Sequence, residues 1–448
     1  MTQETVSEKL DFKRVLPVLV IVLVDLIGLS IIIPLLPLFG AHFGANALTV
    51  GILQATYPMM QFVGAPVLMR LSDRFGRKPI LVFSQIGTLA GFVLLGFSNA
   101  LWMLFLSRII DGLSGANIAT AQAAVADSTN EKTRTQGLGL VGAAFGVGFV
   151  LGPMIAFAVL ALTNESYQAV AFTAAIFSLA SVILTMSWFH ETLTPEEGPA
   201  RARKPAFSLG VMWQALNRPT IGFLLLIMFF YQLAFGGYEQ LFSLFTLTRL
   251  GMGAYDTAGL FSLAGVFIVI VQGGLIGRWS KKKGDRWLVI LGVSALAIGL
   301  IGTALTPQIP VPWYDKAKVL ESLAGEGAFH VSVLSIQVTL PDQAARSWLG
   351  IIWLLAASFP AALGGGLLHP AVNSLITKAS GKGEVGGMLG VSSAFYSAAN
   401  AIAPLFYGSL FQWLGAPVPF FVGGLILAVL WMFAPRVIKK ESRGLAPL

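Results

Sequence analysis

The sequence predicts an all-α polytopic membrane protein with twelve transmembrane helices in two pseudosymmetric halves of six. Three observations carry this prediction. First, 56% of the 448 residues are hydrophobic and only 11% are charged, whereas about 25% of the residues in a typical soluble domain are charged. Second, the apolar residues gather in runs of about 20, the length of a helix that crosses a bilayer. Third, one polar turn recurs in both halves.

Each long apolar run between polar breaks is interpreted as one span, because a helix satisfies its own backbone hydrogen bonds in lipid. In chain order the predicted spans are 15–38, 47–69, 79–98, 101–125, 136–162, 168–190, 219–248, 256–277, 287–306, 349–377, 385–412 and 416–434. The tenth and eleventh are rich in Gly, Ala and Ser, which favours close packing against other helices.

Two longer polar segments interrupt the series. Residues 191–218 are expected to be a cytoplasmic linker between an N-terminal six-helix half, 1–190, and a C-terminal half, 219–448. Residues 307–348 are expected to form an outer loop, either a lid on the outer face or a segment that recognises substrate. Within this loop DKAKVLESLAG (315–325) is helix-like, and FHVSVLSIQVTL (329–340) is expected to be a strand or an interfacial segment.

The distribution of basic residues predicts the orientation. Most of the 29 Lys and Arg residues fall in segments that share one side of the membrane with both chain ends. Because basic loops stay in the cytoplasm, both termini are expected there. The polar N-terminal stretch has no small-residue cleavage site, so the first span is expected to be the insertion signal. We therefore expect a multi-pass, monomeric protein of the cell inner (plasma) membrane.

Several chemistries are excluded by residue content. There is no cysteine, and the four histidines are widely separated, which rules out thiol chemistry and argues against a metal site. No HExxH, GxSxG or P-loop motif is present, so an enzyme or a cofactor-dependent protein is not expected. The net charge of +8 is explained by the cytoplasmic loops rather than by nucleic-acid binding.

The polar turn of the third observation is MRLSDRFGRKP, at 69–79, which follows the second span. A shift of 208 residues lays it on GRWSKKKGDRW, at 277–287, which follows the eighth. Ser72 then aligns with Ser280, and Gly76 aligns with Gly284. A shared turn at equivalent places in the two halves indicates gene duplication and a two-fold pseudosymmetric bundle.

At this position SDRFGRKP resembles the loop signature of the major facilitator superfamily. The drug:proton antiporter branch related to tetracycline exporters is the most similar branch. It shares an Asp in the first span (VDLIGLSIIIPLLPLF from Val24), an Arg in the fourth (Arg108) and a Gly-Pro motif in the fifth (GAAFGVGFVLGP from Gly142). The resemblance covers the whole chain. It implies a secondary transporter whose partners are a small-molecule substrate, protons and the lipid bilayer.

The implied function is proton-coupled export of amphipathic or cationic organic molecules by alternating access. The alternative is a proton symporter, or a lipid or metabolite translocator, of the same fold. One departure from the family pattern keeps this alternative open: Ile155-Ala156 stand where the antiporter motif continues with two glycines. A second departure concerns the turn, because Met69 stands where the family commonly has Gly, and the loss of that Gly changes close packing between the halves.

The resemblance and the rarity of charge inside the spans together select the candidate site residues. The predicted sets are Asp25, Arg108 and Asp111 for proton coupling; Gln54, Tyr57, Asn117, Gln232, Tyr238, Glu239, Asn373 and Tyr396 for the substrate cavity; Asp73, Arg74, Gly76 and Arg77 for a cytoplasmic gate; and Gly148, Gly152 and Pro153 for a helix bend.

Asp25 is the predicted proton carrier, tuned by Arg108 and Asp111, because a carboxyl can gain and lose a proton whereas an arginine keeps its charge. Arg108 and Asp111 are three residues apart on one helix face and are expected to pair. Glu239 is the second candidate carrier. The alternative is that these charges only form structural pairs.

The gate and the bend also have simpler alternatives. Asp73 near a helix C-terminus is unfavourable for the helix dipole, so it should need a cation such as Arg77 or an opposing helix N-terminus. Such a cluster could latch the two halves together, or it could be a basic turn that only sets topology. The glycines near Pro153 indicate either a bend or ordinary close packing. A helix break is also expected at His369-Pro370.

Overall fold

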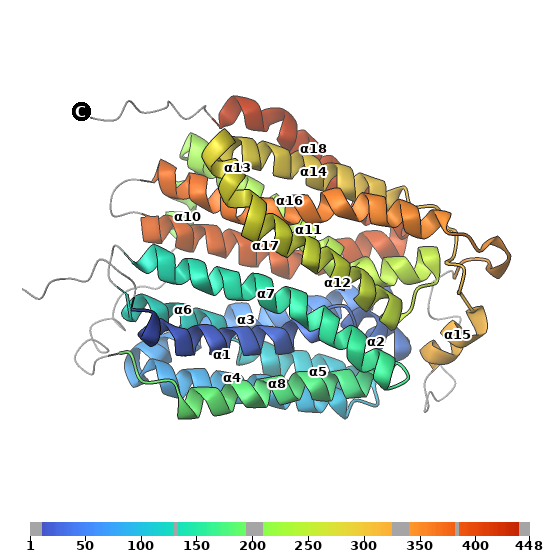
Figure 1. Ribbon diagram of the computed structural model, residues 1–448, viewed down its shortest axis with the longest axis horizontal. Coiled ribbons are helices and arrows are strands. Elements are labelled where there is room, and N and C mark those ends of the chain that lie inside the picture. The colour runs from blue at the N-terminus through green and yellow to red at the C-terminus, as the bar shows by residue number, and fades with distance from the viewer. Residues whose placement is uncertain (1–10, 130–132, 194–208, 325–339, 381–384, 439–448) are drawn as a thin grey trace, which may run out of the picture. The chain divides into compact units, whose positions relative to one another are not determined.

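The computed structural model describes residues 11–129, 133–193, 209–324, 340–380 and 385–438, and within these ranges helices are the regular structure (Figure 1). From the N-terminus the helices are α1 (Phe12–Ile32), α2 (Leu36–His42), α3 (Ala47–Phe75), α4 (Arg77–Gly96), α5 (Leu101–Leu113), α6 (Asn117–Asp127), α7 (Arg134–Leu162) and α8 (Tyr167–Ser187). They continue with α10 (Leu209–Leu216), α11 (Pro219–Leu250), α12 (Ala254–Ile270), the π-helix η1 (Val271–Leu275), α13 (Ile276–Lys283), α14 (Asp285–Ala304), α15 (Lys316–Ala324), the 3₁₀-helix η3 (Gln343–Ala345), α16 (Leu349–Ala379), α17 (Val385–Leu414) and α18 (Pro417–Val437).

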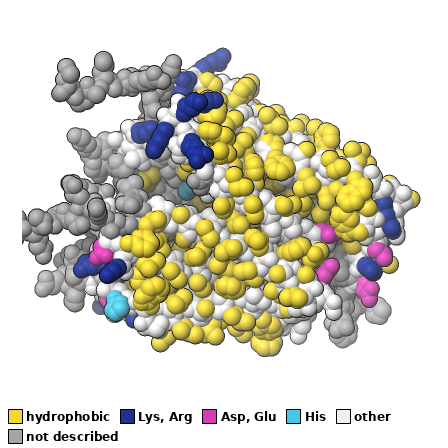
Figure 2. All heavy atoms as spheres, viewed as in Figure 1, with side chains coloured by type: hydrophobic (Ala, Val, Ile, Leu, Met, Phe, Trp, Pro, Cys, Tyr) yellow, Lys and Arg dark blue, Asp and Glu magenta, His cyan; other side chains and the backbone are white. Residues whose placement is uncertain are grey.

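Each of the twelve predicted spans coincides with helix. Among the described residues, nine helical segments are long and apolar enough to cross a membrane. The spans outside that set are helical too. They are α3, the pair α5 and α6, and the succession α12, η1 and α13. On the face seen in Figure 2, hydrophobic side chains cover most of the helical surface, and the charged side chains gather near helix ends. A surface of this kind suits lipid as its solvent.

The chain divides into two compact units. The first unit comprises residues 1–32 and 56–206, and the second comprises 33–55 and 207–448. In the first, α1 packs against α7 and α8, and α4 packs against α5 and α8. Its core includes Val18, Ile21 and Leu26 of α1. In the second, α14 packs against both α16 and α18, and α11 packs against α17. The predicted boundary at 191–218 stays a prediction.

Two spans are interrupted in ways that the hydropathy pattern did not indicate. The first breaks over residues 33–35, between α1 and α2, and the fourth breaks over 114–116, between α5 and α6. The second break places Asp111 near the end of one helix and Asn117 at the start of the next. Discontinuous helices of this kind are common where membrane transporters bind substrate or ions.

The break expected at His369-Pro370 was wrong, because α16 runs unbroken from Leu349 to Ala379. A proline removes one backbone N–H and so frees the carbonyl four residues earlier, which here belongs to Gly366. The side-chain amide of Gln272, in η1, donates to that carbonyl oxygen at 3.2 Å. The helix continues past Pro370, and a side chain from another helix satisfies the carbonyl that the proline leaves without its donor.

The two repeated turns have the same backbone geometry. Gly76 alone separates α3 from α4, with φ 106° and ψ 160°. Gly284 alone separates α13 from α14, with φ 81° and ψ 161°. Side-chain-bearing residues rarely adopt this positive φ, so glycine is required at both places. The repeat seen in sequence is thus also a structural one.

The outer loop is described only in part. The predicted helix at 315–325 is present as α15, which contacts α2. The predicted strand or interfacial segment at 329–340 lies, apart from its last residue, outside the described residues.

Candidate functional site

A small cavity in the first unit is lined by several of the predicted site residues. Asp25 reaches it from α1, Tyr57 from α3, Asp111 from α5 and Asn117 from α6. Asp25 is 9% exposed and Asp111 is 1% exposed. A carboxylate is costly to bury in a membrane-spanning helix, so two of them around one cavity mark a functional candidate.

Asp25 has a single hydrogen-bond partner among the described residues. Its Oδ2 accepts from the side-chain amide of Asn117 at 2.9 Å. Its Oδ1 is buried and makes no hydrogen bond within the same set. Asn117, a predicted residue of the substrate cavity, lines this cavity and also bonds the predicted proton carrier.

Arg108 and Asp111 form the expected pair, with Nη1 and Oδ2 3.2 Å apart. The contact is electrostatic rather than a well-aligned hydrogen bond, since no described residue donates a hydrogen bond to Asp111 Oδ2. The guanidinium is 3% exposed and receives further support from Ser107 Oγ at 3.2 Å and from the Phe92 ring, whose centroid lies 5.5 Å from Cζ. Such a buried cation is stabilised by its counter-ion and by the aromatic face.

One face of α4 braces the break in the fourth span. The hydroxyl of Ser84 bonds the carbonyl of Ser114 and accepts from the backbone N–H of Ala116 at 2.9 Å. One turn later, the hydroxyl of Thr88 accepts from Asn117 at 3.3 Å. Sequence analysis did not select Ser84 or Thr88, although their spacing of four within an apolar helix was a readable signal of a shared polar face.

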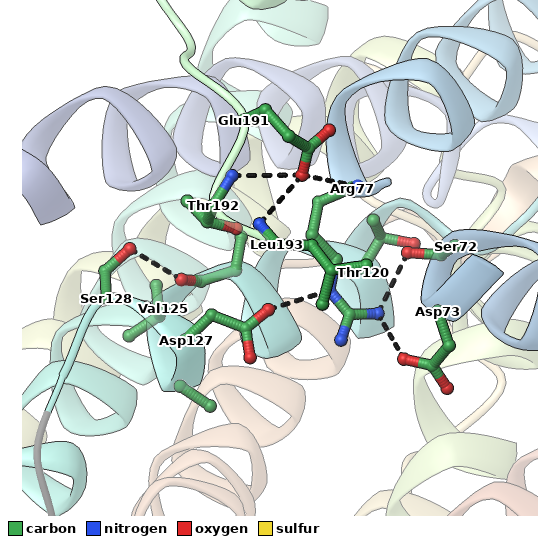
Figure 3. A network of polar contacts seen from close by, with 12 residues as sticks. Ser72, Asp73, Arg77, Thr120, Val125, Asp127, Ser128, Glu191, Thr192 and Leu193 are labelled. Atoms are coloured by element: carbon green, nitrogen blue, oxygen red, sulfur yellow. Dashed lines mark hydrogen bonds and ion pairs between the residues drawn. The ribbon is translucent and has the colours of Figure 1, made fainter. Parts of the chain in front are cut away.

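The predicted cytoplasmic gate is built around Arg77, the first residue of α4 (Figure 3). Its Nη1 lies 2.7 Å from Asp73 Oδ1, and its Nε lies 2.9 Å from Asp127 Oδ2. The hydroxyl of Ser72 accepts from Nη1 at 3.0 Å. Asp73 thus has the cationic partner that the helix dipole argument required. All four residues belong to the first unit.

Glu191 closes the other side of this network, which we call the Arg77 network. One carboxylate oxygen accepts from the backbone N–H group of Arg77 at 2.8 Å (Figure 3), and the other accepts from that of Lys78 at 3.0 Å. An acidic side chain at a helix N-terminus satisfies unpaired donors and complements the dipole. Gly76 leaves room for this cap, since a Cβ there would clash with Glu191. Arg74 stands outside the network, 5.2 Å over the Phe75 ring.

Sequence analysis missed both Asp127 and Glu191. Each is a single acid near a helix end, about 50 and 114 positions from Arg77. Only the fold brings them together.

The turn of the second unit also has a polar network around the first residue of the following helix, but that residue is an acid instead of a base. Asp285, the first residue of α14, binds Ser280 and Ser374 and pairs with Lys378 at 2.9 Å. Ser280 aligns with Ser72 and Asp285 aligns with Arg77, so the second turn has an acid where the first has a base, and its cationic partner comes from α16. The second copy therefore pairs differently from the first.

The glycines of the predicted bend lie against α1. A Cβ at Gly148 would approach Leu26 Cβ to 2.8 Å, and one at Gly152 would clash with Ser30. The hydroxyl of Ser30 donates to the carbonyl of Gly148 at 2.8 Å. Pro153 lies inside the continuous helix α7. These contacts establish close helix packing, while the bend itself stays a prediction.

The predicted cavity residues of the second unit fall into two groups. In one, Asn400 Oδ1 accepts from the side-chain amides of Gln232 at 2.9 Å and Gln240 at 3.3 Å. Gln54, which also belongs to this unit, donates to the carbonyl of Gln240 at 3.1 Å. Gln232 Oε1 is buried without a hydrogen-bond partner in the described part of the chain. Glu239 makes no hydrogen bond or ion pair among the described residues.

The other group lies between α16 and α17. The ring of Tyr396 meets His369 edge to face with centroids 5.1 Å apart. Asn373 lies 3.4 Å from the same imidazole and accepts from Ser392 at 2.8 Å. Tyr238 is separate from both groups and contacts Ser358 at 3.4 Å.

Comparisons with known proteins agree with this architecture. A sequence profile of the Major Facilitator Superfamily matches residues 18–350. Tetracycline resistance protein, class B, of Escherichia coli is 29% identical over 403 residues, which cover 88% of this chain and 87% of that protein. Multidrug resistance protein 1 of Bacillus subtilis (strain 168) is 26% identical over 423 residues, or 93% and 95% of the two chains. The crystal structure of a point mutant of the nucleoside transporter NupG superposes with a TM-score of 0.68 at 8% identity, covering 94% and 100%. This last likeness concerns the fold alone.

Proposed function

Because the chain belongs to the major facilitator superfamily, and is therefore a membrane transporter rather than an enzyme, we propose that it exports amphipathic or cationic organic molecules in exchange for protons. The proposal is supported by relatives named for tetracycline and multidrug resistance, two of which match along nearly the whole chain. The single observation that carries the exchange is the buried carboxyl of Asp25. Within the described residues, one of its oxygens has a hydrogen bond and the other has none.

Asp25 carries the proton, while Arg108 stays positively charged throughout the cycle and influences how readily Asp25 ionises. Arg108 keeps its charge at any relevant pH. Asp111 lies in contact with it and neutralises part of that charge. Movement of the two halves changes the hydration of Asp25, and this change alters the stability of the ionised carboxylate. One carboxyl can therefore bind a proton in one state and release it in another.

A cationic cargo favours the ionised form of Asp25, so cargo entry displaces the proton. The proposed cargo-binding residues of the second unit are Gln232, Tyr238 and Glu239 on α11, Asn373 on α16 and Tyr396 on α17. Aromatic faces and a few hydrogen-bonding groups suit an amphipathic organic molecule. The side-chain oxygen of Gln232, which has no partner among the described residues, is available to a ligand N–H or O–H.

The Arg77 network serves as the cytoplasmic gate of this cycle. It fixes the cytoplasmic ends of α3, α4 and α6 as one charged block. Such a block presents a rigid surface that the other half engages in one state and leaves in the other. Both termini lie in the cytoplasm, the transporter acts as a monomer, and it resides in the inner membrane.

The test uses purified protein in proteoliposomes with tetracycline and ethidium as probes. Exchange predicts that an acidic lumen drives probe accumulation, whatever the orientation of the protein in the vesicle. Asp25→Asn should remove this drive while leaving probe binding measurable. Accumulation driven by an acidic exterior would instead establish symport, the alternative that Ile155-Ala156 keeps open. An Asp25→Asn variant with an undiminished response would exclude Asp25 as the carrier.

A further inference from the structure

The two N–H groups of the Asn117 amide are both committed. One is donated to Asp25 Oδ2 on α1 at 2.9 Å, and the other to Thr88 Oγ1 on α4 at 3.3 Å. The amide oxygen, Oδ1, is buried and has no partner in the part of the chain that the structure describes. Asn117 is 8% exposed and Thr88 is 5% exposed, so water does not readily replace either bond. The orientation of the amide is therefore set by Thr88 as well as by Asp25.

Thr88 and Asp111 line the same cavity as Asp25. An oxygen that accepts a bond from Asn117 keeps its own O–H for another acceptor. The hydrogen bonds run from Asp25 through Asn117 to Thr88, and Asp111 pairs with Arg108 at the same cavity.

The orientation of the amide matters chemically. An amide that presents N–H groups to Asp25 stabilises the carboxylate, whereas the same amide turned by half a rotation presents an oxygen that can accept from the protonated acid. Without the second bond, to Thr88, both orientations become available to Asn117. The side chain would then adapt to either state of Asp25 instead of favouring proton release.

We propose that Thr88 and Asn117 are positioning residues of the proton site. Thr88 holds the Asn117 amide with its N–H groups toward Asp25. The break in the fourth span is what makes this possible, since it places Asn117 at the first position of α6. This inference rests on the proposed proton exchange and adds two residues to it.

The test compares Thr88→Val, which keeps the shape and removes the hydroxyl, with Thr88→Ser, which keeps the hydroxyl. Thr173→Val is the matched control, because the Thr173 hydroxyl bonds the carbonyl of Ala169 on its own helix. Proteoliposomes are assayed in two modes with the probe that wild type transports, tetracycline or ethidium. The first is accumulation driven by an acidic lumen, and the second is exchange of internal for external probe without a gradient.

We expect Thr88→Val to lose about tenfold in gradient-driven accumulation and to keep probe exchange within twofold of wild type. Asn117→Ala should lose gradient-driven accumulation to a similar extent, while Thr88→Ser and Thr173→Val should match wild type. Equal losses in Thr88→Val and Thr88→Ser, or loss of both modes in Thr88→Val, would assign Thr88 a packing role and overturn the inference. So would a Thr88→Val variant with a full gradient response. A wild-type protein without any gradient response would overturn the proposed function instead.

Discussion

The Arg77 network allows a direct test of how much a buried ion pair contributes to the free energy of unfolding of this protein. Arg77 is 3% exposed, and its guanidinium contacts Asp127, whose side chain is 7% exposed, at 2.9 Å. In Arg77→Met the aliphatic volume is kept and the charge is lost, which leaves the Asp127 carboxylate buried without its ion pair to Arg77. Breaking a buried pair in this way costs about 3–5 kcal/mol of the free energy of unfolding.

The matched control lies three residues earlier. Arg74 is exposed and stacks on Phe75, so the same change, Arg74→Met, should cost less than about 1 kcal/mol. The double variant Arg77→Met/Asp127→Leu removes both charges and should recover most of the loss, because two apolar groups can replace a buried pair at little cost.

Unfolding would be followed by tryptophan fluorescence while SDS is titrated into dodecyl maltoside micelles. If Arg77→Met proves no costlier than Arg74→Met, or if the double variant is less stable than Arg77→Met, the buried-pair account of this network is wrong.

Two further predictions concern helix packing. Gly152→Val should reduce transport at least tenfold, because the valine side chain would overlap Ser30 on α1. Gly142→Val should leave transport unchanged, since none of the described residues lies within 4 Å of a Cβ there. Equal transport by the two variants would contradict this prediction. Gln272→Leu should lower the free energy of unfolding by about 1 kcal/mol, because the Gly366 carbonyl then lacks a hydrogen-bond donor. Adding Pro370→Ala, which restores a backbone donor to that carbonyl, should suppress the loss. If the double variant is as unstable as Gln272→Leu alone, Gln272 acts through another contact.

Sequence predicted the elements of this fold well because lipid makes charge expensive. Runs without charges can be recognised one at a time, and the positions of all twelve followed from that rule. The break at His369-Pro370 failed for the opposite reason. Whether a proline interrupts a helix depends on which group satisfies the freed carbonyl, and Gln272 lies about 94 residues away.

Residues of the candidate site could be selected from the sequence, but the contacts between them could not. Asp25, Arg108 and Asp111 could be found because charges inside spans are rare. Asp25 contacts Asn117 rather than Arg108, and this contact depends on the break between α5 and α6. The sequence at the break, Ser-Gly-Ala at 114–116, does not strongly predict a helix end. Thr88 was not selected because a hydroxyl in an apolar helix can bond its own backbone, and only the fold shows that this one accepts from Asn117.

The central claim is that Asp25 gives up a proton when cargo binds. The most direct measurement is the pH change of a weakly buffered detergent solution of purified protein when tetracycline or ethidium is added. Wild type should release protons in proportion to the probe bound, and Asp25→Asn should bind probe with no release. Equal release by wild type and Asp25→Asn, or binding to wild type without any release, would contradict the claim.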